Sequence, residues 1–197
     1  MLFDRKGGAP PEISRFGLSA WHAGLSDIDK AKAARYAGGG PSSRSEFAVS
    51  FMRRANEDHN FSISASLGSH LLGALAGMER FRLIEELVVA RFGMGDYAGC
   101  LEACDAGLEM IGEVLGELKA ESGGEVPERL CCRNYKINAL VGAMHDYDGG
   151  DAALDGFVSM GILSAEDAEF RKRSHRIYRL QRSFDGIYSL RPKDGDS

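Results

Sequence analysis

The most regular hydrophobic pattern in the chain lies in residues 97–118, YAGCLEACDAGLEMIGEVLGEL. Its large apolar side chains are separated alternately by four and three residues, the spacing of one face of an α-helix. The chain contains no comparable alternation of apolar and polar residues that would predict a strand. The sequence therefore predicts an all-α fold. The residues of this pattern are Tyr97, Leu101, Cys104, Leu108, Ile111, Leu115 and Leu118.

Further helical segments lie on both sides of this pattern and are separated by glycine-rich breaks at 38–40, 93–95, 123–124 and 149–150. Glycine next to a helical pattern is typical of a helix end. We expect an irregular array of antiparallel helical hairpins with seven to eight helices. The predicted organisation is an N-terminal arm at 1–41, a helical domain at 42–190 and a tail at 191–197.

The length, charge and composition of the chain indicate a globular protein and argue against several other classes. The chain has 197 residues, a formal net charge of −5 and 44% hydrophobic residues, which is ample for a packed core. An acidic chain does not suit a general nucleic-acid coat protein, because phosphate binding needs positive surface. Residues 1–8 lack the apolar run of a secretory signal, and the uncharged stretch 61–78 is rich in serine and glycine. We expect a cytoplasmic protein with reduced cysteines and no membrane span.

Residues 87–110 resemble a helical hairpin of the tetratricopeptide-repeat family. Gly95-Asp96-Tyr97 is similar to the turn between the two helices of that family, and Leu87 stands where its first helix has leucine. Cys100 and Gly107 stand where the family has small residues at the contact between helices. The resemblance implies a packed hairpin and the binding of a protein or peptide on a concave helical surface. It implies no catalytic residue.

The segment 164–189 predicts a long C-terminal helix with one basic face. Between Glu169 and Asp185 the sequence has no acidic residue. The opposite face carries apolar side chains, and we expect the helix to dock through that apolar face with its basic face exposed. The candidate partner-binding residues on the basic face are Arg171, Lys172, His175, Arg176, Arg179 and Arg182.

The opposite charge is concentrated in residues 96–128, which hold nine acidic side chains and one lysine. The predicted partner-binding residues of this acidic surface are Glu102, Glu109, Glu113 and Glu117. We expect the acidic and basic surfaces to meet each other within the fold or across a dimer, or to select an outside partner. Such contacts weaken as salt is added.

Catalytic and metal-binding patterns are weak in this sequence. Cys100 and Cys104 are one helical turn apart and Cys131 is adjacent to Cys132, but neither pair has the two-residue gap of structural zinc sites. The chain has no phosphate-binding glycine loop, nucleophile elbow or zinc-protease motif. We predict no catalytic residue, no metal and no cofactor. His70, on a small and apolar segment, is expected in the core.

These observations favour a non-catalytic protein-interaction module or scaffold, bound to a protein or peptide or to a second copy of itself. The first alternative is a nucleic-acid-associated regulator that uses the basic helix. The second is a small-ligand or metal-binding protein with a pocket lined by His70 or the cysteines.

Overall fold

The computed structural model describes residues 8–189, with side chains described as far as Phe184. This part of the chain contains eleven α-helices, one 3₁₀ segment and one π-helical segment, and it has no strand. The all-α prediction is confirmed, and the expected count of seven to eight helices is wrong. No described helix is both long and apolar enough to cross a membrane.

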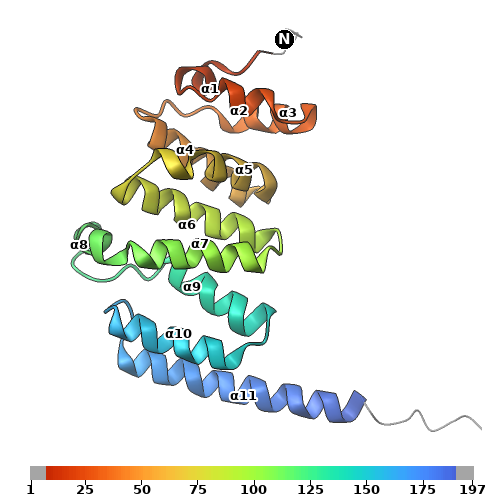
Figure 1. Cartoon of the computed structure of the whole chain (residues 1–197), viewed down its shortest axis with the longest axis vertical. Coiled ribbons are helices and arrows are strands. Elements are labelled where there is room, and N and C mark those ends of the chain that lie inside the picture. Colours follow the sequence, from red (N-terminus) through yellow and green to blue (C-terminus); the bar gives the residue numbers. More distant parts are fainter. Residues whose placement is uncertain (1–7, 190–197) are drawn as a thin grey trace, which may run out of the picture. The chain divides into compact units, whose positions relative to one another are not determined.

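The chain divides into two compact units, Met1–Tyr135 and Lys136–Ser197. The predicted division at residues 41 and 190 stays a prediction, and the boundary within the helix that begins at Cys131 was not expected from the sequence. Each unit is a set of packed helices (Figure 1). The first unit contains α1 (Pro11–Arg15), α2 (Ser19–Ala23), α3 (Asp27–Tyr36), α4 (Arg44–Glu57), α5 (Phe61–Leu71), η1 (Leu72–Ala74), α6 (Gly77–Gly93), α7 (Tyr97–Glu109), α8 (Ile111–Glu121) and the start of α9 (Cys131–Ile137).

Aromatic side chains join the N-terminal helices to α4. The rings of Trp21 and Tyr36 meet Phe51 edge to face, at centroid distances of 5.7 and 5.5 Å. Phe16 packs on Phe47 at 5.1 Å. Such pairs add stabilisation beyond the area that they bury. The N-terminal helices therefore share a core with α4.

The regular pattern of residues 97–118 forms two helices rather than one, because the helix breaks at Met110 between α7 and α8. Cys104, Leu108, Ile111 and Leu118 are nevertheless buried within the chain. The heptad spacing therefore reports a face packed in the core of the first unit.

The second unit contains the rest of α9, the π-helical segment η2 (Asn138–Ala143), α10 (Tyr147–Ser159) and α11 (Ala165–Ser189). The expected break at Gly149 and Gly150 is wrong, because both glycines lie in the first turn of α10. Asp146 caps this helix by accepting a hydrogen bond from the backbone N–H of Gly149 at 2.9 Å. A capped N-terminus lets the helix begin before the glycines.

Three helix-to-helix turns in the described chain share one local geometry. In each, a residue with left-handed backbone is followed by an Asn or Asp at the N-cap and by an aromatic residue at the first helical position. A left-handed residue ends the first helix, and the Asn or Asp begins the next. The three sets are His59-Asn60-Phe61, Gly95-Asp96-Tyr97 and His145-Asp146-Tyr147.

Candidate partner-binding surfaces

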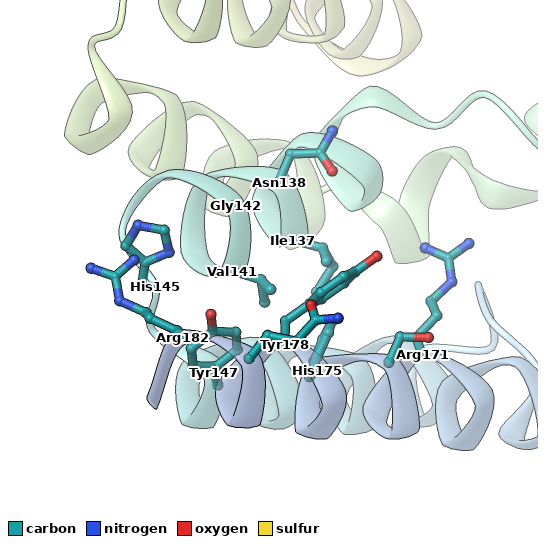
Figure 2. Close-up of a pocket in the computed structure, with 12 residues that line it drawn as sticks. Ile137, Asn138, Val141, Gly142, His145, Tyr147, Arg171, His175, Tyr178 and Arg182 are labelled. Atoms are coloured by element: carbon teal, nitrogen blue, oxygen red, sulfur yellow. The ribbon is translucent and has the colours of Figure 1, made fainter. Parts of the chain in front are cut away.

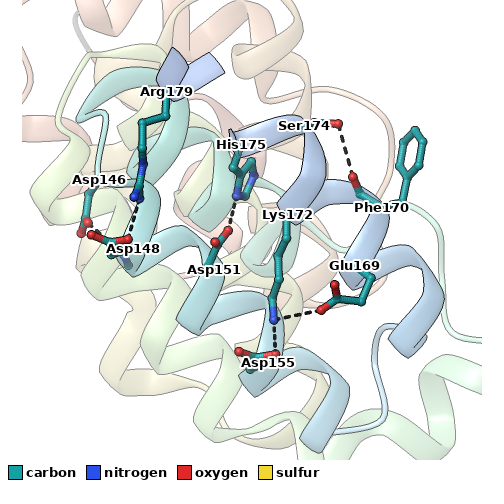
Figure 3. A network of polar contacts seen from close by, with 11 residues as sticks. Asp146, Asp148, Asp151, Asp155, Glu169, Phe170, Lys172, Ser174, His175 and Arg179 are labelled. Atoms are coloured by element: carbon teal, nitrogen blue, oxygen red, sulfur yellow. Dashed lines mark hydrogen bonds and ion pairs between the residues drawn. The ribbon is translucent and has the colours of Figure 1, made fainter. Parts of the chain in front are cut away.

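The basic face of α11 packs against α10 through a row of ion pairs (Figure 3). Lys172 Nζ lies 2.5 Å from Asp155 Oδ1, and Arg179 Nη2 lies 2.5 Å from Asp148 Oδ1. Between them, Nδ1 of the buried His175 lies 2.6 Å from Asp151 Oδ1. The three acids of α10 are spaced by three and four residues, as are the three partners on α11, and the two helices run antiparallel.

The apolar face of α11 points away from this contact. Its exposed fractions are 68% for Phe170, 55% for Ile177, 59% for Leu180 and 57% for Phe184. The expectation that α11 docks through its apolar face is therefore wrong. The helical spacing also puts Ile187 and Tyr188 on this face, but their side chains lie outside the described part.

The inverted orientation has an electrostatic cause. The acidic row of α10 offers one partner to each of Lys172, His175 and Arg179. Individually exposed ion pairs stabilise little, but a buried histidine needs a partner for its ring nitrogen. The spacing of Asp148, Asp151 and Asp155 was the signal in the sequence that would have indicated this packing.

The other predicted basic residues of α11 lie elsewhere on the helix. Arg176 is exposed, as is Arg173 near the apolar face. Arg171 and Arg182 line a cleft of about 610 Å³ within the second unit. Neither of these two arginines forms a hydrogen bond or ion pair with another side chain in the described part of the unit.

The cleft lies between α11 and the segment that holds η2 (Figure 2). Val141 comes from η2, and His145 follows it in a left-handed backbone conformation with φ of 57°. Tyr147 and Tyr178 supply aromatic surface. π-Helical turns are often found at functional sites because they displace side chains from the regular helical positions. No local pattern in the sequence indicates this cleft, since its walls come from segments about thirty residues apart.

The predicted acidic residues are dispersed over two helices. Glu102 on α7 lies 3.4 Å from Arg91 Nη1, measured at Glu102 Oε2. Glu109, Glu113 and Glu117 are exposed, and they form no ion pair within residues 8–184. The cations on α11 that pair with acids in the described structure use the aspartates of α10, and Lys172 also lies 3.4 Å from Glu169 of its own helix.

The four cysteines are free and buried. Burial raises the pKa of the Cys131 thiol to about 12, and burial also raises the pKa of Cys132. No group of three or more potential metal ligands occurs among residues 8–184. His70, expected in the core, is exposed.

A half-buried carboxylate accompanies the cysteines. Glu85 accepts backbone hydrogen bonds from Cys131 at 2.6 Å and Cys132 at 2.7 Å, and so caps the start of α9. Burial raises the pKa of Glu85, while these two hydrogen bonds act in the opposite direction. Glu85 therefore ties α6 to α9, a structural role that the sequence analysis missed.

Comparison of the chain with protein-family models, curated proteins and solved structures finds no match.

Proposed function

We propose that this protein is a non-catalytic interaction module of the tetratricopeptide-like helical-hairpin type, and that its docking surface is the exposed apolar face of α11. The three turns of shared geometry support the hairpin-array part of the proposal. Hairpin arrays commonly present helical surfaces to peptides and proteins. The arrangement of α11 supports the docking surface.

The observation that carries the proposal is the exposure of four large apolar side chains along one helix. Phe170, Ile177, Leu180 and Phe184 are all more than half exposed. Burial of these side chains would stabilise the protein by about 25 cal/mol for each Å² of apolar surface removed from water, and exposure forgoes this stabilisation. Contiguous apolar patches of this kind mark interaction sites on soluble proteins. The second unit exposes the apolar face of α11 and not its basic face, although exposing the apolar face is the less favourable of the two in water.

Charge around the patch indicates the kind of partner. Arg173 and Arg176 are exposed beside the apolar residues, and residues 170–184 contain no acid. Pairing of two copies of α11 through this face would bring arginines together. An amphipathic helix with an apolar stripe and acidic flanks could cover the apolar residues with its stripe and pair with the arginines through its acids. The proposed partner is therefore an acidic amphipathic helix of another protein.

The nucleic-acid alternative has fewer cations available than the sequence suggested. Lys172, His175 and Arg179 already pair with aspartates. Phosphate binding through α11 would depend on the remaining arginines. Such binding would be steeply weakened by salt.

The test uses a fluorescent synthetic helix with leucine at the a and d heptad positions and glutamate on the flanks. We expect the full-length protein to bind it, and the double variant Ile177→Ser/Leu180→Ser to bind at least about tenfold more weakly. Ile28→Ser is the matched control, because Ile28 is 72% exposed in the first unit. Fluorescence anisotropy at two salt concentrations measures the affinities.

Four outcomes would overturn the proposal. If a lysine-flanked peptide bound equally well, the partner would not need to be acidic. If the double variant bound the peptide as tightly as the parent, the apolar face of α11 would not be the docking surface. A random DNA duplex that binds more tightly than the acidic peptide at the same salt would favour the nucleic-acid alternative. Light scattering that finds a dimer lost on Glu113→Gln/Glu117→Gln would assign the surface to a second copy.

A further inference from the structure

The cleft of the second unit has a charge pattern separate from the docking face of α11. Figure 2 shows Arg171 at one end and Arg182 with His145 at the other. Val141, Tyr147 and Tyr178 also line this cleft of about 610 Å³. The volume lies within the range of small-molecule sites. None of its described lining residues is acidic.

The acids next to these walls already have partners. Asp146, between His145 and Tyr147, accepts a hydrogen bond from the backbone N–H of Gly149. Asp148 contacts Arg179, whose guanidinium lies 5.4 Å from the ring centre of Tyr147. Asp151 contacts His175. Arg171 and Arg182 are left without a partner in the described part of the unit. Their positive charge is therefore directed at whatever fills the cleft.

The two arginines stand eleven residues apart on α11. At 1.5 Å of rise per residue, about 16 Å of helix separates them. Their guanidinium groups can turn toward each other over the cleft because arginine side chains are long. The arrangement suits an elongated molecule with an anionic group at each end and a flat apolar middle beside the tyrosine rings.

We propose that this cleft binds a small aromatic dianion. Arg182 and His145 receive one acidic group, and Arg171 receives the other. Tyr178 and Val141 contact the apolar body of the ligand. Arginine suits this role because its planar guanidinium binds carboxylate or phosphate through two hydrogen bonds. The inference does not depend on the protein-binding role of α11, since it uses a different face of the helix.

Isothermal titration calorimetry of the full-length protein tests the ligand class with three probes of one shape. These are para,para-biphenyl dicarboxylate, biphenyl monocarboxylate and biphenyl dimethanol. We expect affinity to fall in that order, by about tenfold for each charge removed, as for the loss of a charge-assisted hydrogen bond. Equal affinity for the dicarboxylate and the neutral diol would overturn the proposal.

Variants then assign the two ends. The Arg171→Gln variant is expected to bind the dicarboxylate only as tightly as the parent protein binds the monocarboxylate. Arg182→Gln is expected to lower the affinity for the dicarboxylate by at least the same factor. Arg173→Gln is the matched control, because Arg173 is exposed on α11 and does not line the cleft. Weakening by Arg173→Gln equal to that by Arg171→Gln would assign the effect to general charge and contradict the site. Ile177→Ser/Leu180→Ser should leave this binding unchanged while weakening peptide binding, so the failure of one proposal can be distinguished from the failure of the other.

Discussion

His175 Nδ1 lies 2.6 Å from Asp151 Oδ1, in the middle of the row of contacts that joins α11 to α10. His175 is buried, whereas the ion pair on its C-terminal side, Arg179 with Asp148, is exposed. The buried member of the row is therefore the one whose loss should matter most, because leaving a buried polar group without its partner costs more than losing an exposed ion pair. The expected effects of variants in the second unit follow from this difference.

Asp151→Ala should destabilise the second unit by about 1–3 kcal/mol, the cost of leaving a buried polar group without its partner. Hydrogen exchange of the α10 and α11 amides measures the change. Asp148→Asn is the control and should change the exchange much less, because its side chain and that of Arg179 are at least half exposed. Equal protection in Asp151→Ala and the parent would contradict the role given to this contact.

Gly150→Ala should destabilise the second unit, because the added Cβ would overlap the Val141 side chain. Overpacking of this kind costs about 1–3 kcal/mol. Gly156→Ala in the same helix is the control, since no atom lies within 4 Å of its added Cβ. Alanine is favoured over glycine in helices by about 1 kcal/mol, so this control should stabilise α10. Hydrogen exchange in α10 distinguishes the two, and the same sign for both variants would contradict the packing.

Glu85 should make the first unit less stable as pH rises above the ordinary carboxyl value of 4.5. Burial raises the pKa of Glu85, so the folded chain keeps a proton at pH values where the unfolded chain has lost it. The free energy of unfolding contributed by this group therefore falls as pH rises toward the folded-state pKa. Glu85→Gln removes the titration and should flatten this part of the profile.

Urea denaturation followed by the fluorescence of Trp21, the single tryptophan, measures this profile in the first unit. The control is Glu113→Gln, because Glu113 is exposed and should leave the pH dependence as in the parent. If the free energy of unfolding of Glu85→Gln fell with pH as steeply as that of the parent, Glu85 would not be the cause of the pH dependence.

The cysteines should react slowly with an aromatic disulfide reagent in the native protein and rapidly in urea. All four are buried, and the pKa of Cys131 raised to about 12 leaves little reactive thiolate at neutral pH. A chelator should leave the native rate unchanged, since the thiols serve packing. Faster labelling after chelation would instead support a bound metal.

Local sequence determined the helical class of the chain and some of the helix ends, but not the number of helices. The spacing from Tyr97 to Leu118 predicted a helical face that is packed in the core, although the break at Met110 was missed because a short kink does not disturb the apolar period. Ser26 is the N-cap of α3, where its side chain accepts a hydrogen bond from the backbone N–H of Asp29. Caps and periods depend on neighbours within a few residues, so the sequence displays them directly.

Only the tertiary structure decided which face of α11 turns inward. Its apolar stripe and its basic stripe were both visible in the sequence, and the usual preference for burying apolar residues pointed to the wrong one. The outcome depended on the surface opposite, where Asp148, Asp151 and Asp155 match the spacing of Lys172, His175 and Arg179. The same packing placed Arg171 and Arg182 over η2 and so created the cleft. The sequence of a helix reveals which residues share each of its faces. The free energy of packing also depends on the surface that the helix packs against, which the sequence of the helix alone does not give.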